Sequence, residues 1–242
     1  MANLVIDIGN TLTKVAVFDQ HQLLHTEYYP DAEEKKLVEL IEKYNISRGI
    51  ISSVRNQTEE WREAVQERIG LKYFSRDMAA GIRNQYKSPE TLGVDRLAAA
   101  IGAYTLYPGK SSLVIDAGTC ITYDHVDAAG NYFGGSISPG LNMRYKALNY
   151  YTGALPLVSA DEKFADTYGD DTGSAILSGV QNGIKYELYG FIESYRNNDP
   201  ELNILLSGGD SIFFDTLLKN SIFAPYVKKE PYLVLKGLNA VI

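Results

Sequence analysis

Two short segments of the sequence place an aspartate directly before a turn that contains glycine. Residues 4–11 are Leu-Val-Ile-Asp-Ile-Gly-Asn-Thr, and residues 113–119 are Leu-Val-Ile-Asp-Ala-Gly-Thr. A glycine lets an oxygen-rich ligand approach the backbone closely, and successive backbone N–H groups can bind phosphate oxygens. The aspartate supplies a hard oxygen of the kind that Mg²⁺ prefers, directly or through water. Both segments therefore indicate a site for a phosphorylated ligand and its metal ion.

The first of these turns carries further groups that suit phosphate. Asn10 and Thr11 offer hydrogen-bonding side chains, and Lys14 adds a point charge. A single turn of this kind could also be an ordinary hairpin in which Asp7 only accepts hydrogen bonds from turn amides. The matching second turn, together with a Ser-Gly-Gly-Asp turn at residues 207–210, favours phosphate binding.

Strand-like and helical patterns alternate along the chain and must position these turns. β-Branched runs at 3–8 and 14–19 predict a hairpin around the first turn, and runs at 113–115 and 121–126 flank the second. Further strands are expected at 49–54 and 203–206, and helices behind a capping box at 31–34 and over 58–69, 94–107, 172–195 and the tail after residue 210. The repeated strand–turn–strand unit predicts an α/β fold of two duplicated halves, residues 1–112 and 113–242, whose turns face each other across a cleft.

Composition and charge exclude several classes of function. The 242 residues include 23 Lys and Arg against 30 Asp and Glu, so the net charge of −7 argues against a nucleic-acid partner. Cys120 is the only cysteine and the three histidines are isolated, which argues against a disulfide and a zinc site. No apolar run approaches the roughly 18 residues of a membrane helix. We expect a soluble, cytoplasmic protein that binds no membrane.

Taken in order, five short motifs resemble those of the type III pantothenate kinases. They lie at residues 7–14, 93–96 (Gly-Val-Asp-Arg), 116–119, 138–140 (Ser-Pro-Gly) and 172–173 (Thr-Gly). Each motif is weakly specific, whereas the ordered set spans nearly the whole chain. The resemblance implies ATP-dependent phosphorylation of pantothenate to 4′-phosphopantothenate, the first step of coenzyme A synthesis. It also implies two ribonuclease-H-like halves around a nucleotide cleft, as in acetate and sugar kinases, heat-shock chaperone ATPases and actin.

The resemblance also assigns roles to individual residues. It implies that ATP and Mg²⁺ are bound by Asp7, Ile8, Gly9, Asn10, Thr11, Leu12, Thr13 and Lys14, with Thr119 also contacting ATP. Asp116 would hold a monovalent cation, K⁺ or NH₄⁺, and Asp95 would be the general base that takes the proton of the pantothenate hydroxyl. Pantothenate would be bound by Tyr86, Gly93, Val94, Asp95 and Arg96, and by Thr172 of the neighbouring subunit of a homodimer.

The residues alone leave alternatives open. Asp95 and Arg96 at a helix start could simply favour the helix dipole and pair at the surface. A non-catalytic, ATP-binding transcriptional regulator on the same fold would need the phosphate turns but no base. Arg144, which follows Ser-Pro-Gly, could reach an anion or be a solvated helix residue. Tyrosines on helical segments are expected at the core edge or a subunit interface: Tyr145, Tyr150, Tyr151, Tyr186 and Tyr189.

Overall fold

The structure, a computed structural model, describes residues 2–55 and 60–242. By its internal contacts the chain divides into two compact units. The first unit comprises Met1–Gly109, Val126–Phe133 and Tyr232–Ile242, and the second comprises Lys110–His125 and Gly134–Pro231. The C-terminal segment therefore belongs to the same unit as the N-terminal one.

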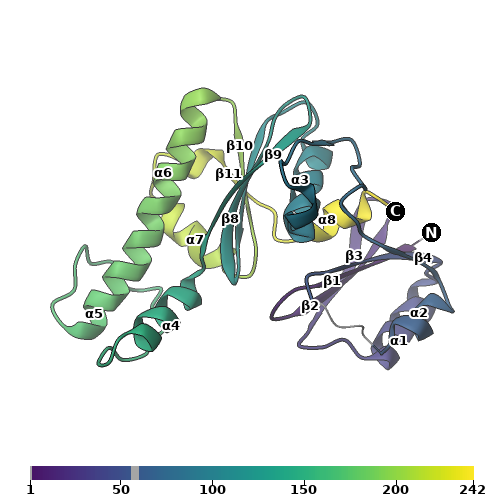
Figure 1. Cartoon of the computed structure of the whole chain (residues 1–242), viewed down its shortest axis with the longest axis horizontal. Helices are drawn as coiled ribbons and strands as arrows, with labels where there is room; N and C mark the ends of the chain where they lie inside the picture. Colours follow the sequence, from purple (N-terminus) through teal and green to yellow (C-terminus); the bar gives the residue numbers. More distant parts are fainter. Residues whose placement is uncertain (1, 56–59) are drawn as a thin grey trace. The chain divides into compact units, whose positions relative to one another are not determined.

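The first unit is built on a five-stranded sheet in the order β3-β2-β1-β4-β5 (Figure 1). Its strands are β1 (Ala2–Ile8), β2 (Thr13–Asp19), β3 (Gln22–Tyr29), β4 (Arg48–Ser53) and β5 (Gly70–Tyr73). β1 runs antiparallel to β2 and parallel to β4. The hairpin predicted around the first turn and the strand predicted near 49–54 are both confirmed.

The two faces of β1 are covered by different helices. Leu4, Ile6 and Ile8 pack in a core cluster with residues of α1 (Glu34–Tyr44) and α2 (Arg62–Gln66). On the other face, the Asn3 side chain donates a hydrogen bond to Asn239 of α8 (Leu233–Asn239). Side chains alternate along a strand, so Asp7 shares the face of Asn3. Figure 1 shows α8 and α3 (Val94–Leu106) on the opposite side of this sheet from α1 and α2.

Helices α3 and α8 pack with their backbones in contact. A Cβ on Gly102 would overlap the carbonyl oxygen of Leu233, and a Cβ on Gly237 would overlap the carbonyl oxygen of Ala98. Only glycine allows an approach this close. The C-terminal helix thus holds in place the helix whose first turn carries Asp95.

The second unit repeats the strand order of the first. Its sheet runs β11-β10-β7-β8-β9-β6, and β10 is parallel to both β7 and β11. These strands are β6 (Arg83–Asn84), β7 (Ser112–Ala117), β8 (Cys120–Val126), β9 (Asn131–Pro139), β10 (Asn203–Ser207) and β11 (Val227–Lys229). From β9 to β11 the order matches β3-β2-β1-β4-β5, and each central strand carries a copy of Leu-Val-Ile-Asp. The short β6 pairs with Asn131 and Tyr132 of β9. These two residues belong to the first unit, whereas the rest of β9 from Gly134 onward belongs to the second.

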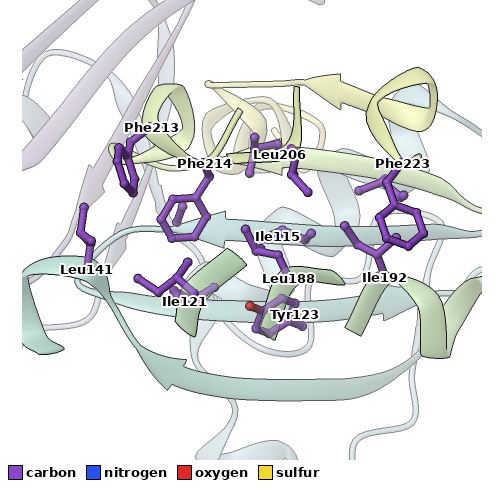
Figure 2. Packing of buried hydrophobic residues seen from close by; sticks show 14 of the residues in the cluster. Ile115, Ile121, Tyr123, Leu141, Leu188, Ile192, Leu206, Phe213, Phe214 and Phe223 are labelled. Atoms are coloured by element: carbon purple, nitrogen blue, oxygen red, sulfur yellow. The ribbon is translucent and has the colours of Figure 1, made fainter. Parts of the chain in front are cut away.

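Helices pack on the second sheet around an aromatic and aliphatic core. Figure 2 shows Ile115, Ile121 and Tyr123 of the strands against Leu188 and Ile192, with Phe214 and Phe223 in the same cluster. The helices are α4 (Leu141–Tyr151), α5 (Thr172–Leu177), the π-helix η2 (Ser178–Asn182), α6 (Gly183–Asn198) and α7 (Ser211–Leu218). Single turns of 3₁₀-helix, η1 (Pro89–Thr91) and η3 (Ala224–Tyr226), complete the elements.

Several predicted elements differ from those observed. The capping box at 31–34 is wrong, because α1 begins at Glu34 after Glu33, which makes no side-chain cap. The helix predicted over 58–69 is shorter, at Arg62–Gln66, and residues 58 and 59 lie outside the described part. The predicted single tail helix is two helices, α7 and α8, since Pro225 and Pro231 interrupt helical geometry between them.

The boundary of the duplication near residue 112 stays a prediction. The compact units are defined by contacts, whereas the boundary was inferred from a sequence repeat, and the two need not coincide. Over residues 2–55 and 60–242, no helix combines the length and apolar character needed to cross a membrane.

Candidate functional site

The first turn joins β1 to β2 and exposes its tip above a buried carboxylate. Asp7, next to the end of β1, is only 5% exposed. The Gly9 N–H donates a hydrogen bond of 3.0 Å to the carbonyl of Leu12, which closes the turn over Asn10 and Thr11. The residues at the tip are exposed. The side chains at the tip, Asn10 and Thr11, are therefore accessible to a ligand.

Sheet pairing brings two further side chains beside Asp7. Lys14 on β2 lies directly opposite Asp7 in the antiparallel register, on the same face and with a Cβ separation of about 5 Å. Ser52 on β4 is the partner of Asp7 on the other side. The Ser52 hydroxyl is buried and has no hydrogen-bond partner within the described residues. The sequence indicated Asp7 and Lys14 but not Ser52, because only strand pairing brings β4 to β1.

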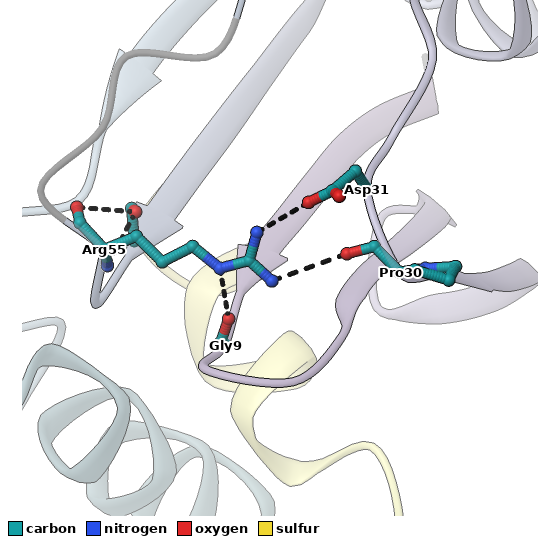
Figure 3. A network of polar contacts seen from close by, with 5 residues as sticks. Gly9, Pro30, Asp31 and Arg55 are labelled. Atoms are coloured by element: carbon teal, nitrogen blue, oxygen red, sulfur yellow. Dashed lines mark hydrogen bonds and ion pairs between the residues drawn. The ribbon is translucent and has the colours of Figure 1, made fainter.

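Arg55, just after β4, holds the first turn from outside (Figure 3). Its Nε donates a 2.8 Å hydrogen bond to the carbonyl oxygen of Gly9. The guanidinium also pairs with Asp31 at 2.7 Å and donates to the Pro30 carbonyl at 3.4 Å. Asp31, expected in a capping box, instead orients this arginine. No sequence motif had singled out Arg55.

The candidate base lies in the first turn of α3, in the same unit as Asp7. The Asp95 carboxylate accepts a 2.9 Å hydrogen bond from the Arg96 N–H. A Cβ on Gly93 would lie 2.6 Å from the nearer Asp95 oxygen. The φ of −59° at Gly93 suits any residue. A side chain at position 93 would therefore have to displace the Asp95 carboxylate, which occupies the space beside Gly93.

Of the residues predicted to bind pantothenate, five lie at or beside the start of α3: Tyr86, Gly93, Val94, Asp95 and Arg96. Thr172 belongs to the second unit. Arg96 is only 5% exposed, and its guanidinium lies 5.7 Å from the centre of the Tyr86 ring. Tyr86 stacks on Tyr132 with ring centres 6.4 Å apart and ring planes at 18°. Because Arg96 is buried, the alternative that Asp95 and Arg96 pair at the surface is wrong. Tyr132 carried no signal in the sequence, since β9 meets the segment of Tyr86 only through the pairing with β6.

The second turn, between β7 and β8, is enclosed by backbone from elsewhere in its unit. The Gly140 N–H donates a 3.1 Å hydrogen bond to the Thr119 carbonyl. A Cβ on Gly140 would overlap the carbonyl oxygens of Gly118 and Thr119. Gly208, with φ of +92°, similarly leaves no room for a Cβ beside the Asp116 carboxylate. These two flanking glycines let distant segments close around the turn.

The Asp116 carboxylate and the segment of Asp210 lie at the second turn. Asp116 is half-buried near the end of β7, with a carboxylate oxygen beside Gly208. The Asp210 N–H donates a 2.9 Å hydrogen bond to the Ala117 carbonyl, so the Ser-Gly-Gly-Asp segment packs on this turn. Burial raises the pKa of the Asp210 carboxyl. Carboxylate and carbonyl oxygens thus converge here, a donor set that suits a hard cation.

Arg144 is not a solvated helix residue, because its guanidinium reaches an anionic group, the Glu187 carboxylate, in a structural network. Its guanidinium pairs with Glu187 at 2.5 Å and donates to Ser138 Oγ at 2.8 Å and to the Pro139 carbonyl at 2.9 Å. Tyr123 donates to the same Glu187 at 2.9 Å, and burial raises the pKa of Tyr123. The network anchors the segment that leads to Gly140, next to the second turn.

Thr172 is presented at a well-capped helix start. Asp171 accepts a 2.7 Å hydrogen bond from the Ser174 N–H, and this bond lowers the pKa of the Asp171 carboxyl. The preceding connection is tied to the helix by Gln181 of η2, which donates to the carbonyl of Asp161 and accepts from its N–H. Thr172 is exposed, so it can contact a group outside its own unit.

Comparisons with known proteins identify one family. The family model described as type III pantothenate kinase matches residues 3–194. Proteins described by the same words are 44% identical in Bacteroides fragilis (strain YCH46) and in Phocaeicola vulgatus, each over 241 residues that cover 99% of this chain and 97% of the relative. A third, from Flavobacterium johnsoniae, is 42% identical over 223 residues, 91% of each chain.

Solved structures identify the fold. The ROK hexokinase from Thermus thermophilus superposes with a TM-score of 0.52 at 13% identity, covering 100% of this chain and 98% of the other. A protein described as a Baf family transcriptional activator, from Campylobacter jejuni, has a TM-score of 0.59 at 21% identity, covering 99% and 96%. At such identities the likeness concerns fold alone, and it confirms two ribonuclease-H-like halves of the actin-like ATPase kind.

Proposed function

The chain belongs to the type III pantothenate kinase family, and from that premise we propose which of its residues perform the reaction. The protein is a kinase that transfers phosphate from ATP to pantothenate, the first step of coenzyme A biosynthesis. The observation that carries this function is 44% identity to such kinases over 99% of the chain.

Asp95 acts as the general base. The primary hydroxyl oxygen of pantothenate forms a bond to the γ-phosphorus, the bond from that phosphorus to the β–γ bridging oxygen breaks, and ADP leaves. The hydroxyl proton passes to the Asp95 carboxylate. Two observations support this role: the space that Gly93 leaves for the carboxylate, and the position of α3 on the same side of the sheet as Asp7. Phosphoryl transfer depends chiefly on positioning and charge stabilisation, which such a held carboxylate can provide.

The first turn binds the ATP phosphates, through residues 8–13 with Asp7 and Lys14. Mg²⁺ is bound in proteins by one or two carboxylates together with substrate phosphates and water, and Asp7 is a carboxylate of that kind, beside exposed turn amides. When bound, Mg²⁺ offsets the negative charge of the β- and γ-phosphates. Lys14, opposite Asp7 on the neighbouring strand, adds a positive charge on the same face.

The second turn contributes Thr119 to ATP and Asp116 to a monovalent cation, K⁺ or NH₄⁺. The support is the convergence of an Asp116 carboxylate oxygen and the Ala117 carbonyl oxygen around Gly208. Such a cation would reduce the repulsion between the phosphates and the carboxylates of this turn.

Pantothenate is bound by Tyr86, Gly93, Val94 and Arg96, and by Thr172 of the partner in a homodimer. The second unit carries exposed aromatic side chains of the kind enriched at protein interfaces. Tyr150 and Tyr151 are 80% and 82% exposed. Tyr145, by contrast, is buried and donates to Gln181, so it belongs to the core. An active monomer, found by light scattering under assay conditions, would contradict the shared site.

The function is tested by ATP turnover with and without pantothenate. We expect ADP to form only when pantothenate is present, and a non-catalytic regulator would form none in either case. Asp95→Asn keeps the shape of the side chain but cannot take the proton, so turnover should fall by about 10²- to 10⁴-fold while calorimetric ATP affinity is retained. Asp7→Asn, the matched control, should weaken Mg²⁺-ATP binding itself. Turnover that falls less than about tenfold in Asp95→Asn would remove Asp95 from this role.

A further inference from the structure

We propose that Arg55 is a positioning residue for the ATP phosphates: it holds the Gly9 carbonyl outward, so that the next backbone N–H faces the phosphates. The inference rests on the proposed function, in which the first turn binds ATP. Arg55 does not itself contact the reacting atoms in this proposal. It acts through the peptide bond between Gly9 and Asn10.

The direction of the Gly9 carbonyl determines the direction of the Asn10 N–H. In a trans peptide the carbonyl and the following N–H point in opposite directions. The 2.8 Å hydrogen bond from Arg55 Nε fixes the Gly9 carbonyl (Figure 3). The Asn10 N–H is consequently directed away from Arg55, and Asn10 itself is exposed.

The hydrogen bond from Arg55 restrains this peptide from turning over. Turning this peptide over changes ψ of Gly9 and φ of Asn10. Gly9 has no Cβ to restrict its backbone, and asparagine adopts a positive φ more readily than most residues, so the rotation costs little. A rotated peptide would present a carbonyl oxygen to the phosphates in place of an N–H, and oxygen lone pairs repel phosphate oxygens. The other end of the turn is already fixed by the hydrogen bond from Gly9 N–H to the Leu12 carbonyl.

Arg55 is itself held in place by several contacts. Its guanidinium pairs with Asp31 and donates to Pro30, and its backbone N–H donates to Ser53 Oγ at 3.1 Å. The planar guanidinium serves three acceptors at once, which a lysine ammonium cannot do with the same geometry. The Asp31 side chain is 75% exposed, so the ion pair adds little to stability. We therefore assign to the Arg55 contacts the role of orienting the first turn rather than of stabilising the fold.

The test compares Arg55→Ala with a matched control on the same strand. Arg48, at the opposite end of β4, also donates one Nε hydrogen bond, of 2.9 Å, to Asn3 far from the turn. In Arg55→Ala we expect the dissociation constant and KM for Mg²⁺-ATP to rise by about tenfold or more, the scale of a lost charge-assisted hydrogen bond. KM for pantothenate should be unchanged, and Arg48→Ala should behave as the unmodified protein.

Two further measurements separate positioning from a general loss of structure. Arg55→Lys, which keeps the charge but not the fork, should regain only part of the ATP affinity and serves as the test if Arg55→Ala does not fold. Millimolar guanidinium should restore ATP binding to Arg55→Ala but not to Asp7→Asn. Unchanged ATP affinity in Arg55→Ala, with affinity lost in Asp7→Asn, would overturn the role of Arg55 alone. Unchanged affinity in both variants would instead show that the turn does not bind ATP, and the proposed function of the turn would fail.

Discussion

The first turn, between β1 and β2, is held by a side chain, whereas the second, between β7 and β8, is enclosed by backbone. Arg55 bonds to the Gly9 carbonyl from outside, and the tip of the first turn stays exposed. Around the second turn, Gly140 and Gly208 approach so closely that neither could carry a Cβ. The same sequence pattern is therefore constrained by a side-chain hydrogen bond from Arg55 in one unit, and by close backbone packing with its own backbone hydrogen bonds in the other.

The two turns also differ in which glycine could not carry a Cβ without a steric clash. A Cβ on Gly118, within the second turn, would lie 3.8 Å from the Cys120 carbonyl, an ordinary contact. The motif glycine is therefore less confined than its flanking neighbour Gly140, which the repeated motif does not include. In the first turn a Cβ on Gly9 would lie 3.2 Å from the Leu12 carbonyl, close enough to require a small shift.

Gly140→Ala should have the largest effect on stability. Its φ of −70° is open to any residue, so the cost is steric: the new methyl group must displace the Gly118–Thr119 turn. We expect a loss of about 3 kcal/mol in the free energy of unfolding, measured by urea titration, together with weaker ATP binding. Gly118→Ala is the control, with a change within about 0.5 kcal/mol. Equal losses in the two variants would mean that backbone does not confine this turn.

Asp116→Asn should show whether the dependence of activity on a monovalent cation comes from the second turn and not from the first. The unmodified protein should be active in K⁺ or NH₄⁺ and much less active in Na⁺ or Tris buffer. In Asp116→Asn we expect this difference to vanish and the rate in K⁺ to fall by about tenfold or more, the scale of losing one electrostatic contact in a site. Asp7→Asn should keep its cation dependence at whatever rate remains. A requirement for K⁺ that survives in Asp116→Asn would place the cation elsewhere.

Gly9→Ala should have a smaller effect that depends on Arg55. With Arg55 present the turn can shift by a few tenths of an ångström while its carbonyl stays bound, so we expect a loss of about 1 kcal/mol or less. In the Arg55→Ala background the same substitution should cost more in ATP affinity, with a coupling of about 0.5–3 kcal/mol in a double-mutant cycle. Additive effects would show that Arg55 and the turn act independently.

Asp210→Asn should have the smallest effect on stability. The effect should be absent at low pH and appear as the pH rises. Burial raises the pKa of the folded carboxyl above its unfolded value of 3.8, so the folded state favours the protonated form. The unmodified protein consequently loses stability relative to Asp210→Asn as the pH rises from 3.8 through the raised pKa. Melting temperatures measured across this range should separate with increasing pH and converge at low pH. A variant that is less stable at neutral pH would reverse the sign and contradict the cause.

Local signals predicted the parts of the site that lie within one stretch of chain. The hairpin around Asp7, the start of α3 at Val94 and the matching strand before Asp116 all follow from residues adjacent in sequence. Arg55 was missed because its acceptors lie on two segments far from it in sequence, at Gly9 and at Pro30–Asp31. The capping box failed for the same reason: Asp31 has a stronger partner in Arg55 than in the helix amides beside it.

By itself the sequence determined that two copies of Leu-Val-Ile-Asp are strands that end in turns with glycine, and that Asp95 lies in the first turn of a helix. These properties depend on strand and turn propensities over a few residues. Only the tertiary structure decided what holds each turn, because Arg55, Gly140 and Gly208 reach their turns through sheet pairing and close packing. It also placed α8 against α3, since Gly102 and Gly237 signal a backbone contact only when their partner helix is known. Contacts between residues far apart in the chain produce no periodic pattern in the sequence, so they are determined by how the folded chain packs.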